Sequence, residues 1–210
     1  MPKLTVYGTP VSVYVRIVRL LLEEAAAAYD LKSVDIFNGE NQAPEYLAKN
    51  PFGKVPTFEV DGAFIYETTA ITGYLDAVLA NHKFSPSDPL LQARMRQVMG
   101  IVDSHLYTPA IGSIAIQRLI VPSQGGTTDE GKVKEAIAPV KKALEAIESL
   151  TVGAPYLLGH EISIADLYLI PVFTYLSQTP EYNVTTAQTP KLRAWWNEVS
   201  QRPSVKKVCA

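Results

Sequence analysis

The sequence predicts a two-domain protein in which an α/β domain is followed by an all-helical domain. Residues 1–80 alternate between strand-like and helix-like patterns, whereas residues after 90 show only the helical spacing of apolar side chains. Between them, residues 81–89 (NHKFSPSDP) contain two prolines and little apolar content, which is typical of a linker. We therefore expect one domain over residues 1–80, a linker over 81–89 and a second domain over 90–210.

The α/β domain is expected to have the element order β-α-β-α-β-β-α, with a right-handed βαβ unit at its start. The predicted elements are a strand over Lys3–Tyr7, a helix from Val13, a strand over Leu31–Phe37, a short helix over Pro44–Lys49, strands over Val55–Val60 and Ala63–Tyr66 joined at Asp61-Gly62, and a helix over Thr68–Leu79. In the first helix, Val15, Val18 and Leu22 recur at helical spacing, and Arg16 and Arg19 lie opposite this apolar stripe.

The second domain is expected to be helical throughout. Its helices are predicted over Leu90–Ala115, Asp129–Leu150, Ser163–Leu176 and Pro190–Gln201. Ser163 and Asp166 match a capping box at the start of the third of these helices. Pro139 and Pro171 should kink or interrupt their helices, because proline removes a backbone donor and its ring clashes with the preceding turn.

Composition excludes several classes of function. The chain has 210 residues, of which 47% are hydrophobic, and 19 basic against 21 acidic residues give a net charge of −2. No basic face is dense enough to indicate nucleic acid as a partner. The only cysteine is Cys209, which excludes intrachain disulfides and thiolate zinc sites. Histidines 82, 105 and 160 lie too far apart for a HExxH-type motif, so we expect no metal.

Targeting signals are also lacking in the sequence. The N-terminal residues MPKLTVYGTP have no apolar core of the kind that a signal peptide carries. The longest apolar stretches, such as Leu167–Leu176, are half of the roughly 20 residues that a membrane span requires. We therefore expect a soluble, cytoplasmic protein that has no membrane partner.

Two separated motifs carry a resemblance to a known family. The segment Asn50–Ile71 (NPFGKVPTFEVDGAFIYETTAI) and the turn Gly8-Thr9-Pro10-Val11-Ser12 resemble the cytosolic glutathione transferases, and the domain order agrees over the whole chain. The serine-type branch, with its plant phi-like and bacterial members, is the most similar. The resemblance implies a thioredoxin-like first domain, a homodimer, and conjugation of the co-substrate glutathione to hydrophobic electrophiles.

Ser12 is the candidate catalytic residue. A cysteine-like thiol has a pKa near ~8.5, so a mostly ionised thiol at neutral pH requires a shift of roughly two units, about 2.7 kcal/mol. A hydrogen bond to a charged group contributes about 1.5–3 kcal/mol, and a helix N-terminus adds roughly 0.3–1 kcal/mol. Ser12 follows a turn and precedes a helix. At that place one hydroxyl can supply most of the free energy that the pKa shift requires. Its alternative role is a simple N-cap. Tyr7 is the alternative donor, because tyrosine-type members use a phenol from the first strand.

The resemblance also implies a glutathione-binding set. Asn41 and Gln42 align with residues that contact the glycyl carboxylate, and Lys54 with one that reaches the tripeptide. Val55, before a cis Pro56, would pair with the cysteinyl unit. Glu67 and Thr68 would hold the γ-glutamyl end, with Thr68 as the helix cap, although a simple cap and a first-turn acid are their ordinary roles. Apart from this alignment, Asp103 lies in the middle of a predicted helix at the expected domain face and is a candidate for the same network; a solvated or helix-paired acid is the alternative.

The electrophile site is predicted on the long first helix of the second domain. Tyr107, Ile111 and Ile114 carry bulk suited to hydrophobic co-substrates and lie near Asp103 in the sequence. Two other functions share the same scaffold. One is a glutathione-dependent peroxidase or isomerase, and the other is a binding module with little turnover.

Overall fold

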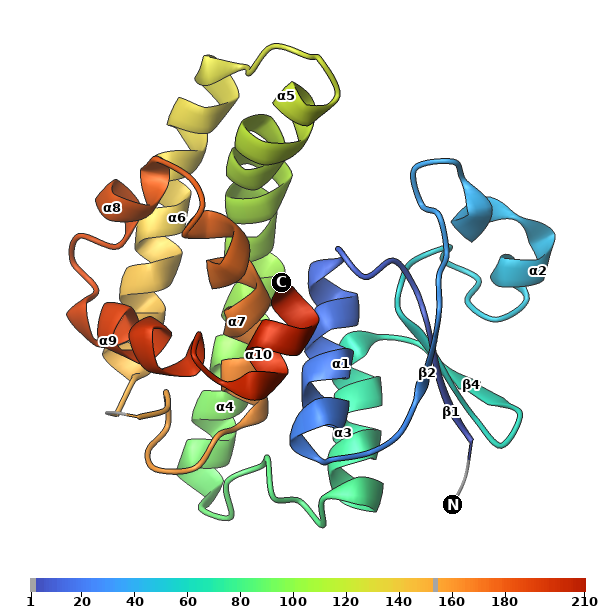
Figure 1. Cartoon of the computed structure of the whole chain (residues 1–210). Coiled ribbons are helices and arrows are strands. Elements are labelled where there is room, and N and C mark those ends of the chain that lie inside the picture. Colours follow the sequence, from blue (N-terminus) through green and yellow to red (C-terminus); the bar gives the residue numbers. More distant parts are fainter. Residues whose placement is uncertain (1–2, 153–154) are drawn as a thin grey trace. The chain divides into compact units, whose positions relative to one another are not determined.

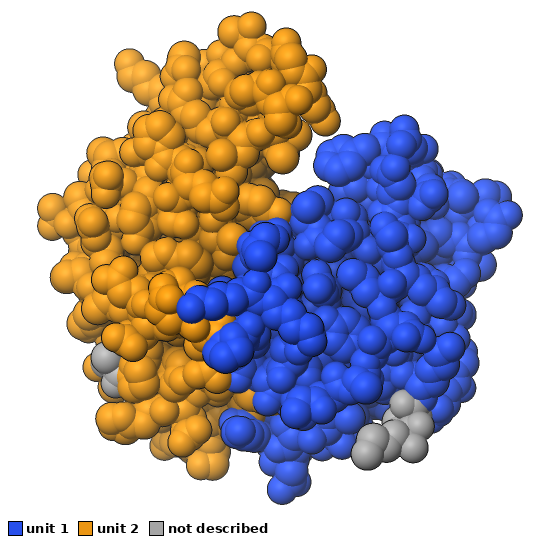
Figure 2. Space-filling view, viewed as in Figure 1, with its two compact units in different colours: residues 1–83, 203–210 blue, residues 84–202 orange. Residues whose placement is uncertain are grey.

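The computed structural model describes residues 3–152 and 155–210. The chain divides into two compact units, one formed by residues 1–83 together with 203–210 and the other by residues 84–202 (Figure 2). The first boundary therefore falls after Lys83, inside the expected linker, and the second returns the C-terminal residues to the first unit.

The first unit is built on a mixed four-stranded sheet with the strand order β2-β1-β3-β4. The strands are β1 (Leu4–Tyr7), β2 (Asp30–Lys32), β3 (Thr57–Val60) and β4 (Ala63–Ile65) (Figure 1). β1 runs parallel to β2 and antiparallel to β3, and β3 forms a hairpin with β4. With the helices, this confirms the predicted order β-α-β-α-β-β-α.

Helices cover both faces of this sheet. α1 (Val13–Glu24) and α3 (Thr68–Leu79) pack side by side (Figure 1). The ring of Phe58, from β3, lies 6.2 Å from that of Tyr74 on α3, and Val6 and Phe58 are fully buried. Side chains alternate along a strand, so Tyr7 points to the other face. There it packs with Tyr46 of α2 (Pro44–Leu47), which follows the short 3₁₀ turn η1 (Glu40–Gln42).

The C-terminal helix α10 (Pro203–Cys209) packs against α1, which corrects the expected second domain of 90–210 (Figure 1). Val205 and Val208 of α10 are buried. Its Lys207 donates to Glu23 of α1 at 2.8 Å, and Ser204 donates to Glu24. The sequence could not assign this helix to a domain, because a short amphipathic segment carries no signal of its partner.

The second unit is all-helical. Its elements are α4 (Pro89–Ile101), η2 (Val102–Leu106), η3 (Thr108–Ile120), α5 (Val121–Ser123), α6 (Glu130–Leu150), α7 (Ile164–Leu176), α8 (Glu181–Thr185) and α9 (Pro190–Val199). The expected helix over 90–115 is therefore present, but from Val102 its backbone winds as a wider π-helix and extends to Ile120. Pro139 and Pro171 lie inside α6 and α7 without interrupting either helix. In the described parts of the chain no helix is long and apolar enough to cross a membrane.

The predicted capping box at α7 is present and forms a buried network. Asp166 Oδ2 accepts hydrogen bonds from the Ser163 backbone at 2.8 Å and from its hydroxyl at 2.7 Å. Its Oδ1 accepts from the Leu157 backbone at 2.9 Å and from Trp195 Nε1 at 2.8 Å. Burial raises the pKa of the Asp166 carboxyl, although these donors favour its charged form. One carboxylate thus connects the start of α7 to α9.

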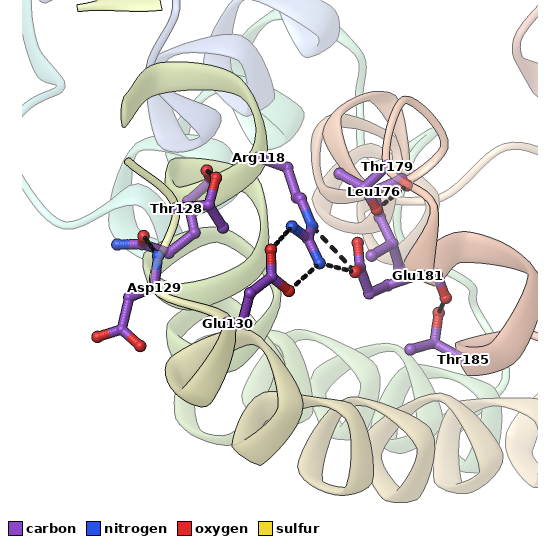
Figure 3. A network of polar contacts seen from close by, with 9 residues as sticks. Arg118, Thr128, Asp129, Glu130, Leu176, Thr179, Glu181 and Thr185 are labelled. Carbon is purple, nitrogen blue, oxygen red and sulfur yellow. Dashed lines mark hydrogen bonds and ion pairs between the residues drawn. The ribbon is translucent and has the colours of Figure 1, made fainter. Parts of the chain in front are cut away.

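A second polar network joins η3 to α6 and α8 (Figure 3). Arg118 of η3 donates from Nη1 and Nη2 to the two carboxylate oxygens of Glu130, at 2.6 and 2.8 Å. The same guanidinium donates from Nε and Nη2 to Glu181 Oε1, at 3.0 and 2.7 Å. Glu181 is only 6% exposed, whereas Glu130 is exposed. One arginine of the π-helical segment therefore binds a carboxylate on each of two neighbouring helices.

Candidate active site

Ser12 lies in the connection between strand β1 and helix α1. The strand ends at Tyr7, and the turn Gly8–Val11 leads into α1, for which Ser12 is the N-cap. Its backbone N–H donates to the Thr9 carbonyl at 3.1 Å, and its Oγ accepts from the Val15 N–H at a long 3.5 Å. The hydroxyl oxygen of Ser12 caps the helix only weakly. Capping uses a lone pair of this oxygen, so the hydroxyl proton stays available for donation. Ser12 can therefore cap and donate at the same time.

Glycine at position 8 lets three segments of this site meet. A Cβ there would lie 2.4 Å from Val15 Cγ2, too close for any larger residue, and 3.2 Å from Val55 Cβ, a tight contact. The turn after β1, the first turn of α1 and the loop before β3 therefore pack against one another. This brings the Ser12 turn and Val55, which the sequence assigned to one site, to the same edge of the sheet.

The Tyr7 hydroxyl is engaged elsewhere on the sheet. It donates its proton to Glu59 Oε2 of β3 at 2.5 Å and accepts a hydrogen bond from Lys32 Nζ of β2 at 3.0 Å. The hydrogen bond to Tyr7 raises the pKa of the Lys32 ammonium. The Tyr7 ring lies edge-on to Phe64 of β4, with centroids 6.3 Å apart. The phenol is thus part of a polar cluster that spans β1, β2 and β3, and its ring also contacts β4.

The Val55–Pro56 peptide bond is cis, as the family resemblance predicts. Val55 packs against the small apolar cluster of Tyr7, Val34 and Tyr46. The Lys54 carbonyl accepts hydrogen bonds from the Tyr46 hydroxyl at 2.7 Å and from Asn50 Nδ2 at 2.8 Å. The Lys54 side chain is exposed. The loop before β3 is therefore fixed by its backbone, while the lysine extends into solvent.

The start of α3 corrects the expected capping role of Thr68. The N-cap is Glu67, and Thr68 is the first residue of the helix. Glu67 has φ 68° and ψ 114°, a positive-φ backbone conformation that residues other than glycine rarely adopt, and it makes no side-chain cap hydrogen bond. Residues held in such conformations concentrate at ligand-binding sites. The positive end of the α3 dipole therefore has no capping side chain of its own.

Asn41 and Gln42 both turn towards one backbone carbonyl. Asn41 Nδ2 donates to the Gly53 carbonyl at 2.7 Å, and Gln42 Nε2 donates to the same oxygen at 3.4 Å. Gly53 has φ +58°, and a Cβ there would lie 2.8 Å from the Asn41 carbonyl oxygen. These amides therefore join η1 to the Asn50–Gly53 turn, a contact that the alignment of single residues could not reveal.

The four remaining candidate residues lie in the second unit: Asp103 on η2, Tyr107 between η2 and η3, and Ile111 and Ile114 on η3. Asp103 is exposed, and Tyr107 is half-buried, with a pKa that burial raises. Ile111 is 8% exposed and Ile114 is fully buried. Ile114 therefore belongs to the core of the unit, which argues against its expected place in the electrophile lining. The sequence could not fix the phase of this helix, because the π-helical winding shifts each side chain relative to an α-helix.

Comparison with known proteins decides the family. The model of the glutathione S-transferase N-terminal domain matches residues 2–77, and that of the C-terminal domain matches residues 106–203. The chain belongs to the glutathione S-transferase family. This confirms the predicted thioredoxin-like and all-helical domains and the predicted activity, transfer of glutathione to electrophiles.

Relatives match this transferase along its whole length. The probable glutathione S-transferase GSTF2 of Oryza sativa subsp. japonica is 36% identical over 211 residues, which cover 100% of this chain and 97% of the relative. Among solved structures, glutathione S-transferase I bound with lactoylglutathione has a TM-score of 0.85 and 31% identity, covering 99% of this chain and 98% of the other. Glutathione S-transferase I from mais in complex with an atrazine glutathione conjugate has a TM-score of 0.84 and 31% identity, covering 99% and 96%. Similarity to plant transferases agrees with the phi-like branch.

The helical spacing in the sequence puts one residue near the site on the wrong side of its helix. Arg16 was expected on the polar side of α1, but it is only 5% exposed, and its Nε donates to the Pro10 carbonyl at 3.1 Å. The amphipathic spacing of α1 gives no local signal for this burial, because Arg16 stands opposite the apolar stripe of Val15, Val18 and Leu22. Within residues 3–152 and 155–210, no group of three or more His, Cys, Asp or Glu side chains could hold a metal ion.

Proposed function

We propose that Ser12 activates glutathione in this transferase by donating a hydrogen bond to its sulfur. The observation that carries the proposal is the contrast between two hydroxyls. Ser12 stands at the N-terminus of α1 with its oxygen only weakly bonded to the helix, whereas Tyr7 gives its proton to Glu59. Of the two candidate donors, Ser12 is the one whose proton can be given to a sulfur.

The energetics are adequate without a general base. Lowering a thiol pKa by about two units takes about 2.7 kcal/mol. A charge-assisted hydrogen bond from Ser12 contributes about 1.5–3 kcal/mol, and the dipole of α1 adds roughly 0.3–1 kcal/mol. The thiolate then forms a carbon–sulfur bond with the electrophile, and any leaving group departs with the bonding electrons.

The rest of the tripeptide would be held along the edges of the same sheet. We assign the cysteinyl unit to the backbone of Val55 and the γ-glutamyl carboxylate to the first N–H groups of α3, beginning at Thr68. Glu67 supplies the negative charge for the γ-glutamyl amine. Its unusual backbone conformation supports this role, because a strained residue persists where it serves a ligand. The exposed Lys54 is the cation available to the glycyl end.

Asn41 and Gln42 would act on glutathione through the loop that they hold. Their hydrogen bonds to Gly53 shape the segment that leads into Lys54 and Val55.

In the second unit, we retain Tyr107 as a lining residue of the electrophile site and Asp103 as a member of the glutathione network. A hydrophobic electrophile is supported by the atrazine conjugate bound to the relative from mais.

We further expect a cytoplasmic homodimer. The first unit exposes large apolar side chains on neighbouring segments: Phe52 is 64% exposed and Phe64 is 39% exposed. Phe52 also contacts Tyr66 edge-on, with ring centroids 5.9 Å apart. Grouped apolar surface of this kind is typical of an interface. Light scattering at micromolar concentration should return twice the mass of one chain, and a single-chain mass would contradict the homodimer.

The test of the Ser12 role is a pair of substitutions, one that removes the hydroxyl and one that keeps it. Ser12→Ala should raise the pKa of bound glutathione by about one to two units and lower the conjugation rate at neutral pH by about 10- to 100-fold. Ser12→Thr keeps the hydroxyl and should stay close to wild type in pKa. The pH dependence of kcat/KM with a chlorinated aromatic reads the pKa, and the KM for glutathione should change little. An unchanged profile in Ser12→Ala would contradict the proposal.

A further inference from the structure

Arg16 is a buried arginine in an unfavourable place. It is the fourth residue of α1 and only 5% exposed, and the first turn of this helix holds no acidic residue. A positive charge near a helix N-terminus opposes the helix dipole, and its burial adds a desolvation cost. The Arg16 side chain donates a hydrogen bond that leads not along the helix but back to the turn before it, to the Pro10 carbonyl.

The Arg16 side chain reaches the turn that carries Ser12, because its Nε donates to the Pro10 carbonyl at 3.1 Å. The backbone N–H of Arg16 donates to the Ser12 carbonyl at 2.9 Å, the first ordinary hydrogen bond of the α-helix. The Ser12 N–H in turn donates to the Thr9 carbonyl at 3.1 Å. The guanidinium thus fixes the turn from the helix side, two residues before the serine.

Packing buries the beginning of this turn, at Gly8 and Thr9, but not its middle. Pro10 and Val11 are both exposed, so the segment just before Ser12 has much of its side-chain surface in solvent. A rotation of the Pro10–Val11 backbone would redirect Ser12 and its hydroxyl. A hydrogen bond from a buried, packed side chain to the Pro10 carbonyl limits that rotation.

We propose that Arg16 is a positioning residue for Ser12. Its Nε–H holds the Pro10 carbonyl, and the turn so fixed directs the Ser12 hydroxyl towards the glutathione sulfur. Lysine could not take this role, because its donors sit only at the end of a flexible stem, whereas arginine donates from a rigid planar fork. The inference rests on the proposed role of Ser12 as the hydroxyl donor.

The experiment uses two substitutions at Arg16 and one matched control. Arg16→Met removes the donor and the charge, and Arg16→Lys removes the Nε donor but keeps the charge. Arg19→Met is the control, because Arg19 lies on the same helix and its Nε donates to the Tyr29 hydroxyl at 3.2 Å, away from the turn. The pKa of bound glutathione, from the pH profile of kcat/KM and from thiolate absorbance, is measured beside thermal unfolding.

Both Arg16 variants should lower kcat/KM at neutral pH by about three- to tenfold and raise the glutathione pKa correspondingly, with the KM for glutathione within about twofold of wild type. Arg19→Met should keep the wild-type profile. If Arg16→Lys keeps the wild-type profile while Arg16→Met loses it, charge and not position is what matters, and the proposal is overturned. It is also overturned if both variants lose glutathione binding together with activity, since Arg16 would then hold the fold rather than the turn.

A double variant separates this inference from the function on which it rests. If Arg16 acts through Ser12, Arg16→Met should add less than about a twofold loss in the Ser12→Ala background. An added loss as large as in the wild-type background would overturn the positioning role. Ser12→Ala alone tests the serine, so a shifted pKa there with unshifted Arg16 variants refutes the inference and leaves the role of Ser12 intact. An unshifted Ser12→Ala refutes both.

Discussion

The Tyr7 hydroxyl donates its proton to Glu59 Oε2 at 2.5 Å, across the neighbouring antiparallel strands β1 and β3. This hydrogen bond distinguishes Tyr7 from Ser12, the two hydroxyl donors that the sequence left as alternatives. A phenol has a single proton to give, so a tyrosine that donates to a carboxylate has none for a sulfur. The acceptor lone pair of the same oxygen is used as well, by Lys32 at 3.0 Å.

Tyr7→Phe should therefore act on stability and leave catalysis almost unchanged. The substitution removes one hydrogen bond to a half-buried carboxylate and one from Lys32, so the free energy of unfolding should fall by about 1–2 kcal/mol. The pKa of bound glutathione should stay within about 0.3 units of wild type, because the sulfur loses no donor. Urea unfolding and the pH–rate profile measure the two effects. A pKa that rises as far as in Ser12→Ala would assign the chain to tyrosine-type chemistry.

Arg118 should be essential for the stability of the second unit. Its guanidinium is the partner of Glu181, whose carboxylate is almost fully buried (Figure 3). Arg118→Met leaves that charge without its cation, which typically costs about 3–5 kcal/mol. Adding Glu181→Gln to Arg118→Met should recover part of the loss, because the buried group is then neutral. Urea unfolding of the single and double variants tests this, and equal stabilities of the two would contradict it.

The bond from Arg118 to Glu130 should be visible in the pH dependence of stability. Hydrogen bonding to Arg118 lowers the pKa of the Glu130 carboxyl. A carboxyl whose pKa is lower in the folded state binds fewer protons there, so its contribution is present above the unfolded pKa of about 4.3 and is lost as pH falls through the lower folded value. Wild type should thus be more stable than Glu130→Gln at neutral pH. The difference should close at acid pH and shrink with added salt. A difference that is constant over pH would refute the charge contribution.

The sequence predicts the fold well wherever the signal is local. Helix α3 begins and ends at the predicted Thr68 and Leu79, and the hairpin turns at Asp61-Gly62. The capping box at Ser163 is also present. Each of these follows from neighbouring residues, namely apolar spacing, turn chemistry and reciprocal capping. By contrast, prolines 139 and 171 do not end their helices, because tertiary packing on both α6 and α7 outweighs the loss of one backbone bond.

The site is predictable in its residue types and less so in its contacts. Ser12 and the Glu67-Thr68 pair stand at helix starts as expected, but which of the pair is the N-cap depends on the backbone of Glu67. Arg16 is buried although α1 carries it at a position that helical spacing assigns to the polar side, and α3 and α10 pack against α1 from distant parts of the sequence. Helical periodicity alone predicts that such a residue lies on the polar, solvent-facing side of its helix. Long-range packing therefore decides the positions that local patterns leave open.

Glu67 should contribute to glutathione affinity and not to the ionisation of the thiol. Its carboxylate is exposed, and its φ of 68° holds it at the N-terminus of α3, where the proposed γ-glutamyl amine would meet it. Glu67→Gln keeps the size and the backbone strain but removes the charge. The KM for glutathione should rise about tenfold, as expected for a lost charge-assisted hydrogen bond. The pKa of bound glutathione and the kcat at saturation should remain near wild type, because Ser12 is untouched.

A substrate analogue provides the control for Glu67. Glutathione that lacks the γ-glutamyl amine has no cation for Glu67, so wild type and Glu67→Gln should bind it equally well. Thermal unfolding of the two proteins should also agree, since Glu67 makes no side-chain cap hydrogen bond to α3. If Glu67→Gln weakens both ligands equally, the carboxylate shapes the loop rather than pairing with the amine. If it weakens neither, the γ-glutamyl end lies elsewhere and the proposed orientation of the tripeptide along the sheet is wrong.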